Sequence, residues 1–451
     1  MRDQHESLKE TKELISFLYG CQLQDLPLEV QTKTKLCLLD ALGAAIAGPS
    51  IMEPVRIVYD LAKKLGPGPV TLLGDGAQVQ VIAGAMANGV SAMALDLGDV
   101  HRDAFFHASA GIIPAILATS EEVGSVSGKD ILLATALGIE TGIRIALSVN
   151  PELRLRGLDT TSQCGIFGAA AGSLKILGAD TEQFLNGLAL AGTQSSGDIQ
   201  YIVDGDWSKC LHPGKSSSDG VLAAYLAHKG YVGPHNILEG RYGFPMSAAG
   251  IFHGEQITKG LGRDWRVLEM GMKIHAACRF SNAAIDAALE IKSSHDFDAN
   301  DIQAVRVRMG SLGVDQLGNK EIHSFYDGQM SAPFLVSVAL QKGRVNFRDV
   351  LEGISDEMVK ALMQRVDMKV DKEIGETSRD TIVEIDLENE KILTVRKNIP
   401  RGEPELPLEQ KELENKFLEL TDTFMPEKGA RALLDRILNL ERLRTIEELF
   451  A

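Results

Sequence analysis

Cysteine and aromatic residues are scarce in this chain of 451 residues, which has 5 cysteines and an aromatic fraction of 5%. The cysteines lie far apart and are odd in number, and no two of them have the spacing of a redox or zinc-binding pair. This usage argues against a framework of disulfides and fits a reducing compartment, so we expect a cytoplasmic protein.

Long apolar runs are also missing. No segment offers about 18 consecutive apolar residues, the length of a membrane-spanning helix, and the charged N-terminus does not resemble a signal peptide. Positive charge is outnumbered, because 46 Lys and Arg face 62 Asp and Glu and the net charge is −16. A surface this acidic repels nucleic acid and anionic membranes, so neither is an expected partner. An anionic ligand would need a local group of Lys or Arg side chains.

Several motifs of nucleotide, metal and hydrolase sites are absent. The segment 124–130 contains glycines and a lysine without the spacing of a phosphate-binding loop, and no Gly-x-Gly-x-x-Gly follows a predicted strand. The Gly-x-Ser-x-Gly turn of α/β-hydrolases does not occur. His101 and His107 are not spaced as a pair of zinc ligands. These absences argue against a dinucleotide-binding fold, a zinc site and an α/β-hydrolase.

Most of the chain has helical character. Its length allows two or three domains, and the hydrophobic fraction of 44% is ordinary for a globular protein. The helices predicted in the first 265 residues are rich in Ala and Gly, and they cover 8–48 (as two helices), 82–94, 111–122, 128–147, 162–177, 181–191, 216–229 and 256–260. Helical patterning returns from residue 407 to the C-terminus.

A segment between these helical regions alternates apolar and polar residues. The alternation predicts strands at 304–309, 366–370, 381–387 and 392–396. We therefore predict a mainly α protein. Its large helical domain is built from both chain ends (1–265 and 403–451), with a smaller α+β lid domain between them (266–402).

The first cluster of titratable residues follows the predicted helix 82–94. Asp96, Asp99, His101 and His107 place two carboxylates and two imidazoles within a dozen residues, a combination suited to proton transfer. On a helix, Asp96 and Asp99 would share a face because they are three residues apart. The alternative is a polar helix end followed by a solvated loop.

A second cluster combines Lys209, His212 and Lys215. Its Gly and Pro residues predict a tight loop before a helix that starts near Ser216. Backbone N–H groups at such a helix start favour anions, and the lysines would add positive charge. A capped turn with surface lysines is the alternative.

A third cluster lies at the start of a helix predicted to run to Lys292. His275 and Arg279 are four residues apart and would share a helical face, with Cys278 beside them. Arg279 can hold a carboxylate with two N–H donors, although a helix start with an incidental arginine is the alternative. A weaker stretch, 154–161, combines arginines and threonines with Asp159, and an ordinary helix start explains it.

These clusters, in this order, resemble the motifs of the MmgE/PrpD family over most of the chain. The most specific string is Asp204–Gly–Asp–Trp–Ser–Lys–x–Leu–His–Pro–Gly. The other matching strings are Ala94–Leu–Asp–x–x–Asp, His107–Ala–Ser–Ala–Gly–Ile–Ile–Pro, Gly165–Ile–Phe–Gly–Ala–Ala–Ala–Gly, Leu190–Ala–Gly–Thr–Gln–Ser–Ser–Gly and Ile237–Leu–Glu–Gly–Arg–Tyr–Gly–Phe. The resemblance implies a helical domain with an α+β lid, a homodimer, and neither a metal nor an organic cofactor. It also implies chemistry at a carbon next to a carboxylate of a small polycarboxylic acid.

The resemblance assigns residues as well. Asp96, His107, Lys209 and His212 match active-site positions, and Cys278 stands where decarboxylases of the family have a histidine. Three further departures are Val100 for a usual Thr, Asp159 for a usual His, and Phe334 for an expected Tyr. The lost polar groups predict a substrate that differs from those of the best-known members, because sites built on hydrogen bonds discriminate strongly.

The mechanism expected from these residues is the formation of a carbanion next to a carboxylate. His107 is the predicted base or acid, Lys209 stabilises the developing charge, and His212 or Cys278 handles a proton on the opposite side. Asp96 and Asp99 orient and charge-stabilise the imidazoles rather than react. The predicted substrate-binding residues are Asp99, His101, Asp159, Lys215, His275 and Arg279.

Four functions remain open at this point. The first is a dehydratase-like lyase, and the second is an epimerase of a dicarboxylate such as iminodisuccinate. The third is a decarboxylase of the cis-aconitate type, which Cys278 and Phe334 disfavour. The fourth is a member that binds polyacids without catalysis.

Overall fold

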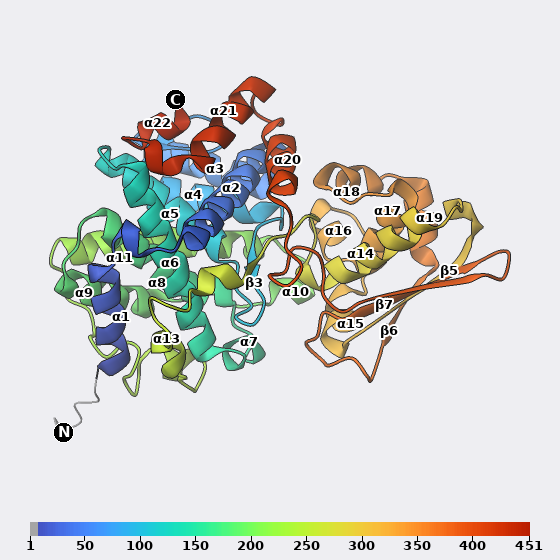
Figure 1. Cartoon of the computed structure of the whole chain (residues 1–451), viewed down its shortest axis with the longest axis horizontal. Helices are drawn as coiled ribbons and strands as arrows, with labels where there is room; N and C mark the ends of the chain where they lie inside the picture. Colours follow the sequence, from blue (N-terminus) through green and yellow to red (C-terminus); the bar gives the residue numbers. More distant parts are fainter. Residues whose placement is uncertain (1–7) are drawn as a thin grey trace.

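The computed structural model describes residues 8–451 and is mainly α-helical (Figure 1). Part of the N-terminal segment considered for a signal peptide, residues 1–7, lies outside this range. The long N-terminal helices are α1 (Lys9–Gly20), α2 (Leu28–Ile51), α3 (Glu53–Leu65), α4 (Val81–Ala94), α5 (Ala108–Val123), α6 (Gly128–Val149), α8 (Thr160–Ile176), α9 (Thr181–Gln194) and α11 (Ser208–His228). The short ones are α7 (Glu152–Leu155), α10 (Tyr201–Asp204), α12 (Phe244–Ala248) and α13 (Glu255–Thr258).

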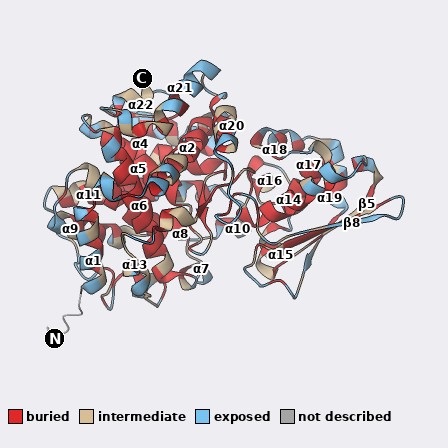
Figure 2. Cartoon of the chain, viewed as in Figure 1, coloured by how far each residue is buried: buried red, intermediate tan, exposed pale blue. Residues whose placement is uncertain are grey.

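The long helices form one buried bundle (Figure 2). Small residues bring their backbones close together, as the Ala- and Gly-rich sequence predicts. A Cβ atom on Gly89 of α4 would lie 2.8 Å from the Cα of Gly214 in α11, so neither helix tolerates a side chain there. This close approach sets the end of α4 beside the start of α11, and it brings Asp96 within reach of Lys209.

The C-terminal helices return to this bundle. They are α20 (Gln410–Thr421), α21 (Glu427–Leu438) and α22 (Glu447–Phe450). Both α20 and α21 pack against α2, and Lys416 of α20 donates to the buried Asp40 of α2 over 2.5 Å. The expected return of helical structure after residue 403 is confirmed.

Residues 279–397 form the region on the right of Figure 1, which contains the largest sheet. Its strands are β5 (Ile302–Met309), β6 (Val366–Val370), β7 (Thr381–Leu387) and β8 (Ile392–Lys397), in the order β6-β5-β7-β8. Only β5 and β6 pair in parallel, and β7 and β8 form a hairpin. All four predicted strands are present. Four strands of two residues lie elsewhere and form two pairs. One pair is β1 (Val70–Thr71) with β2 (Gln78–Val79), and the other is β3 (Val100–His101) with β4 (Met270–Gly271).

Helices cover one face of this sheet. The helix α14 (Arg279–Ser294) packs on β7 and β8, and α17 (Ala332–Lys342) packs on α14. The remaining helices are α15 (Ser311–Leu317), α16 (Phe325–Gln329), α18 (Phe347–Gly353) and α19 (Glu357–Gln364). The apolar side chains of β5 at Val305, Val307 and Met309 are buried, as their alternation predicts.

Two helices, α2 and α6, are long and apolar enough to cross a membrane by length and composition alone. Their most apolar stretches are, respectively, 72% and 94% buried within the fold. Core helices of globular proteins pass the same test, so these helices are weak evidence for a membrane span.

Two local predictions near the titratable clusters are wrong. The helix α4 ends at Ala94, and Asp96 has a left-handed backbone with a φ of 48°, so Asp96 and Asp99 do not share a helical face. The helix α11 begins at Ser208 and continues through Pro213, where a loop was expected. Tertiary packing of α11 against α4 and α8 outweighs the local preference of Pro and Gly.

Candidate active site

A small cavity of about 80 Å³ collects residues from distant parts of the chain. The helical bundle contributes Asp96, His107 and Lys209, while the sheet-containing region contributes Arg279 and Arg379. The other polar residues that line the cavity are Arg154, Asp159, Thr160, Thr161, Tyr201, Cys278 and Gln316. The three sequence clusters therefore meet at one place, although not every member reaches it.

Asp96 lies between two lysines at one side of the cavity. Its carboxylate accepts hydrogen bonds from Lys209 Nζ at 2.7 Å and from Lys273 Nζ at 2.5 Å. Burial would raise the pKa of Asp96, but the two ammonium groups overcome this and hold the pKa below its ordinary value. Two cations against one carboxylate leave this cluster with a single excess positive charge.

Lys273 is a site residue that the sequence reasoning missed. Its side chain is completely buried, and Nζ also donates to the backbone oxygen of Asp96 at 2.7 Å. Burial lowers the pKa of Lys273 to about 8, with Asp96 opposing the shift and Lys209 adding to it. Its position two residues before His275 of the third cluster was a signal. However, lysines are mostly exposed, and no local pattern marks this lysine as buried.

His107 caps the N-terminus of α5 (Ala108–Val123) and faces the same cavity. Its Nδ1 lies 2.7 Å from the backbone oxygen of Asp99. A carbonyl oxygen only accepts, so Nδ1 carries the hydrogen and Nε2 keeps its lone pair. Burial, together with the charge of Lys273, lowers the pKa of His107 to about 3. The imidazole is therefore neutral, and its Nε2 carries a free lone pair.

Two guanidinium groups supply donors at another side of the cavity. Arg279 Nε donates to the buried Glu403 at 2.9 Å, whereas its Nη2 has no partner among residues 8–451. The buried Nε of Arg379 likewise has no partner in the described chain, and burial lowers the pKa of Arg379 to about 10. Both guanidinium side chains line the cavity close to the buried Glu403, and their remaining donor capacity suits a ligand carboxylate.

Arg379 was also missed by the sequence reasoning. It lies in the loop between β6 and β7, where no motif surrounds it and no helical period marks a buried face. Its guanidinium stacks over the ring of Phe280 at 5.1 Å. Only the fold of the sheet-containing region brings this loop to α14.

Asp159, Tyr201 and His212 form a separate polar group beside the cavity. The Tyr201 hydroxyl donates to Asp159 Oδ2 at 2.9 Å, and His212 Nδ1 lies 3.7 Å from the same oxygen. Burial opposes ionisation of Asp159, but pairing with His212 and the N–H of Ser162 lowers its pKa. Asp159 and Tyr201 line the cavity, and His212 stands behind them. His212, which was predicted to handle a proton directly, is not among the residues that line the cavity.

The departures from the family pattern have different surroundings. Val100 and Cys278 line the cavity, so the groups they replace would face the substrate. Phe334 instead lies in the core of the sheet-containing region and is 1% exposed. A tyrosine at that position would not reach the cavity, so the argument drawn from the lost phenol is wrong.

Four predicted substrate-binding residues do not line the cavity. His101 pairs with Glu269 at 2.9 Å, and His275 pairs with Asp286 at 3.0 Å. Lys215 binds Asp219 one turn along α11. The Asp99 carboxylate accepts from Ser109, while its backbone oxygen orients His107. His275 precedes α14, which begins at Arg279, so the two residues do not share a helical face as predicted.

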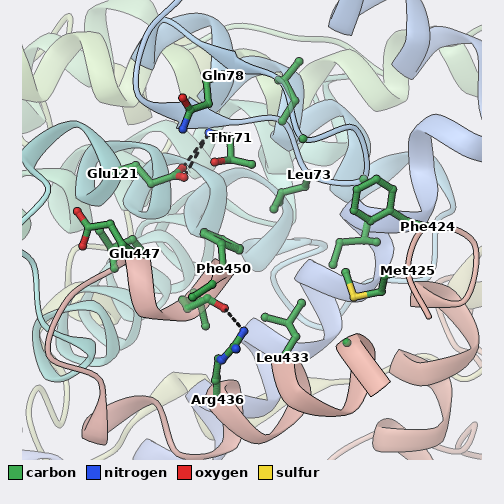
Figure 3. Close-up of a pocket in the computed structure, with 18 of the residues that line it drawn as sticks. Thr71, Leu73, Gln78, Glu121, Phe424, Met425, Leu433, Arg436, Glu447 and Phe450 are labelled. Carbon is green, nitrogen blue, oxygen red and sulfur yellow. Dashed lines mark hydrogen bonds between the residues drawn. The ribbon is translucent and has the colours of Figure 1, made fainter. Parts of the chain in front are cut away.

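Larger cavities lie elsewhere, and one of about 500 Å³ is lined by His275, Arg344, Lys416 and two glutamates. Figure 3 shows one of about 710 Å³ between β1, β2 and the C-terminal helices α21 and α22. Apolar side chains such as Leu73, Phe424 and Leu433 make up most of its wall. Its buried acid is Glu121, which accepts from the backbone N–H of Thr71 at 3.3 Å. No three His, Cys, Asp or Glu residues gather as metal ligands anywhere in residues 8–451.

Comparison with known protein families gives two matches that together cover most of the chain. The profile of the MmgE/PrpD N-terminal domain matches residues 12–257, and that of the MmgE/PrpD C-terminal domain matches residues 275–442. The chain belongs to the MmgE/PrpD family. Together the two matches include every residue that lines the small cavity.

Curated relatives within this family are distant but similar over nearly their whole length. The chain is 25% identical to a cis-aconitate decarboxylase of Aspergillus terreus, over 97% of this chain and 94% of the relative. It is 22% identical to the cis-aconitate decarboxylase of Mus musculus, over 96% of this chain and 91% of the relative. A cis-aconitate decarboxylase-like protein of Aspergillus oryzae is 24% identical over 98% of this chain.

Proposed function

We propose that this protein is a cofactor-independent lyase that forms a carbanion next to a carboxylate of a small polycarboxylic acid. One observation carries the proposal: His107, whose Nε2 keeps its lone pair, lines the same cavity as the guanidinium side chains of Arg279 and Arg379. The base and the carboxylate-binding groups thus surround one small cavity, which positions them around a bound acid.

The chemistry follows from these positions. A substrate carboxylate binds to the guanidinium groups, and Nε2 of His107 takes the proton from the adjacent carbon. Negative charge then moves onto the carboxylate. The excess positive charge of the Lys209–Asp96–Lys273 cluster stabilises it in a buried setting where electrostatic interactions are strong. Loss of a hydroxide from the next carbon completes a dehydration.

Decarboxylation is a second candidate, in which the carbanion forms by loss of CO₂. The names of the curated relatives favour it. Phe334 no longer counts against it, because this side chain lies away from the cavity. Cys278 still counts against decarboxylation, because a thiol occupies the cavity wall where decarboxylases of the family have an imidazole.

The assembly and location remain proposals. We take residues 266–402 as a lid, because Arg279, Gln316 and Arg379 complete a cavity whose other residues belong to the helical bundle. The family resemblance supports a homodimer. The five cysteines are all unpaired, which supports a reducing, cytoplasmic location.

A turnover assay on a panel of acids tests the proposal. The panel contains 2-methylcitrate, citrate, cis-aconitate, malate and iminodisuccinate, and the products are identified by proton NMR. We expect one acid to give a new vinyl signal with no loss of carbon, the mark of dehydration. Loss of CO₂ would establish the second candidate, and inversion without elimination would mean an epimerase. Binding of the acids without conversion of any of them would contradict the proposal and leave a non-catalytic member.

A further inference from the structure

We infer that Asp159 selects acids that carry a hydroxyl or amino group beside a carboxylate, and this inference rests on the proposed function. The observation behind it is a buried carboxylate in the wall of a cavity that is otherwise suited to anions. Asp159 is 6% exposed and lines the cavity together with Tyr201. A carboxylate at that place repels a bare anion and accepts hydrogen bonds.

The acceptor capacity of Asp159 is only partly used. Its Oδ1 accepts from the N–H of Ser162 at 2.8 Å, and its Oδ2 accepts from the Tyr201 hydroxyl at 2.9 Å. The imidazole of His212 is 3.7 Å from Oδ2, too far for a hydrogen bond. A carboxylate offers about four lone-pair sites, so each oxygen keeps acceptor capacity for a ligand.

The surrounding charges favour an acid with a neighbouring donor. Arg154 lines the same cavity, and its charge acts on Tyr201, the partner of Asp159. This end of the cavity therefore presents a cation and an acceptor together. A hydroxyl or amino group next to a carboxylate satisfies both, with the donor at Asp159 and the carboxylate at Arg154. Arg279 and Arg379 remain for a second carboxylate.

A purely structural role for Asp159 is the competing explanation, because its side chain caps the N-terminus of α8 (Thr160–Ile176). Asn caps a helix as well as Asp does. Asp159→Asn therefore keeps the cap and the shape while it removes the negative charge. A merely structural Asp159 predicts no change in ligand preference in this variant.

The experiment measures dissociation constants for matched pairs of acids by calorimetry on the full-length protein. Malate and aspartate are each compared with succinate, and citrate with tricarballylate, so that the members of a pair differ by one hydroxyl or, for aspartate, by one ammonium group with its charge. We expect the wild type to bind the donor-bearing acid about 10- to 100-fold more tightly, as hydrogen bonds to a charged group do. Malate and aspartate distinguish a hydroxyl from an amino group as the preferred donor.

Variants separate this inference from the proposed function. Asp159→Asn should remove most of the preference, whereas Arg379→Gln should weaken both members of a pair by a similar factor. Equal binding within every pair by the wild type, or an undiminished preference in Asp159→Asn, would overturn the inference. If the protein converted an acid that lacks the donor and bound it as tightly as the donor-bearing member of the pair, the inference about Asp159 would fail while the proposed lyase would stand. A clear preference without any turnover would support the role of Asp159 and defeat the lyase.

Discussion

Turnover by the variant His107→Asn is expected to fall by about a hundredfold or more, the usual contribution of a positioned acid–base group. The wild-type imidazole presents an unprotonated Nε2 because Nδ1–H donates to the backbone oxygen of Asp99. Asn retains a donor for that carbonyl but has no basic nitrogen. Substrate binding should change little, because the proposed carboxylate-binding groups are Arg279 and Arg379.

His101→Asn is the matched control for this variant. His101 lies six residues before His107, but it is buried, pairs with Glu269 and does not line the cavity. Its turnover per folded molecule should stay within a few-fold of the wild type. Wild-type turnover in His107→Asn would remove His107 as the acid–base group, and equal losses in both variants would point to a general disturbance of the loop.

The variant Asp96→Asn is expected to lose about 3–5 kcal/mol of stability, the cost of removing one partner from a buried ion pair. Lys209 and Lys273 would face each other without a counter-charge, and Lys273 is completely buried. The backbone is not the cause, because Asn tolerates the φ of 48° that Asp96 adopts. Turnover should fall as well, since Lys273 would then release its proton. Denaturant unfolding followed by circular dichroism measures the stability.

The sign of the pKa shift of Asp96 determines the pH range in which Asp96→Asn lowers the stability. The pKa of Asp96 is lower in the folded protein than in the unfolded chain. Its stabilisation is therefore present above the unfolded pKa and is lost only when the pH falls through the lowered value. At about pH 5 the carboxylate is still fully ionised, so the effect of Asp96→Asn should remain complete.

Asp99→Asn provides the contrast under the same conditions. Burial and the nearby charge of Asp40 raise the pKa of Asp99 to about 6. At about pH 5 most Asp99 side chains are already protonated, so Asp99→Asn replaces a neutral carboxyl group with a neutral amide. The loss of stability should therefore be far smaller than in Asp96→Asn. Equal losses in the two variants at this pH would contradict the assigned charges of the cluster.

The elements of the fold were predictable where the pattern is regular. The alternation of Val305, Val307 and Met309 gave a strand, and the small residues of α4 and α11 gave close helix packing. The start of α11 was not predictable, because Pro213 breaks the local pattern while packing against α4 keeps the helix continuous. Propensity is a weak guide wherever tertiary contacts are extensive.

The site was predictable only in part for a related reason. His107, Lys209 and Arg279 were identified because each stands in a cluster of polar residues along the chain. Arg379 has no such neighbours and reaches the cavity through the fold of a loop. His101 and His275 show the opposite error, because they pair with Glu269 and Asp286 and do not line the cavity. Proximity in sequence does not reveal the direction of a side chain.

The measurement that tests the central claim most directly is the exchange of solvent deuterium into a bound acid. The protein is incubated in D₂O with each acid that binds, and proton NMR follows the signal of the carbon next to the carboxylate. Formation of a carbanion by His107 predicts loss of that signal, or its replacement in product, with wild type and not with His107→Asn. Full retention of the signal with every acid that binds, or equal exchange in the variant, would contradict the account.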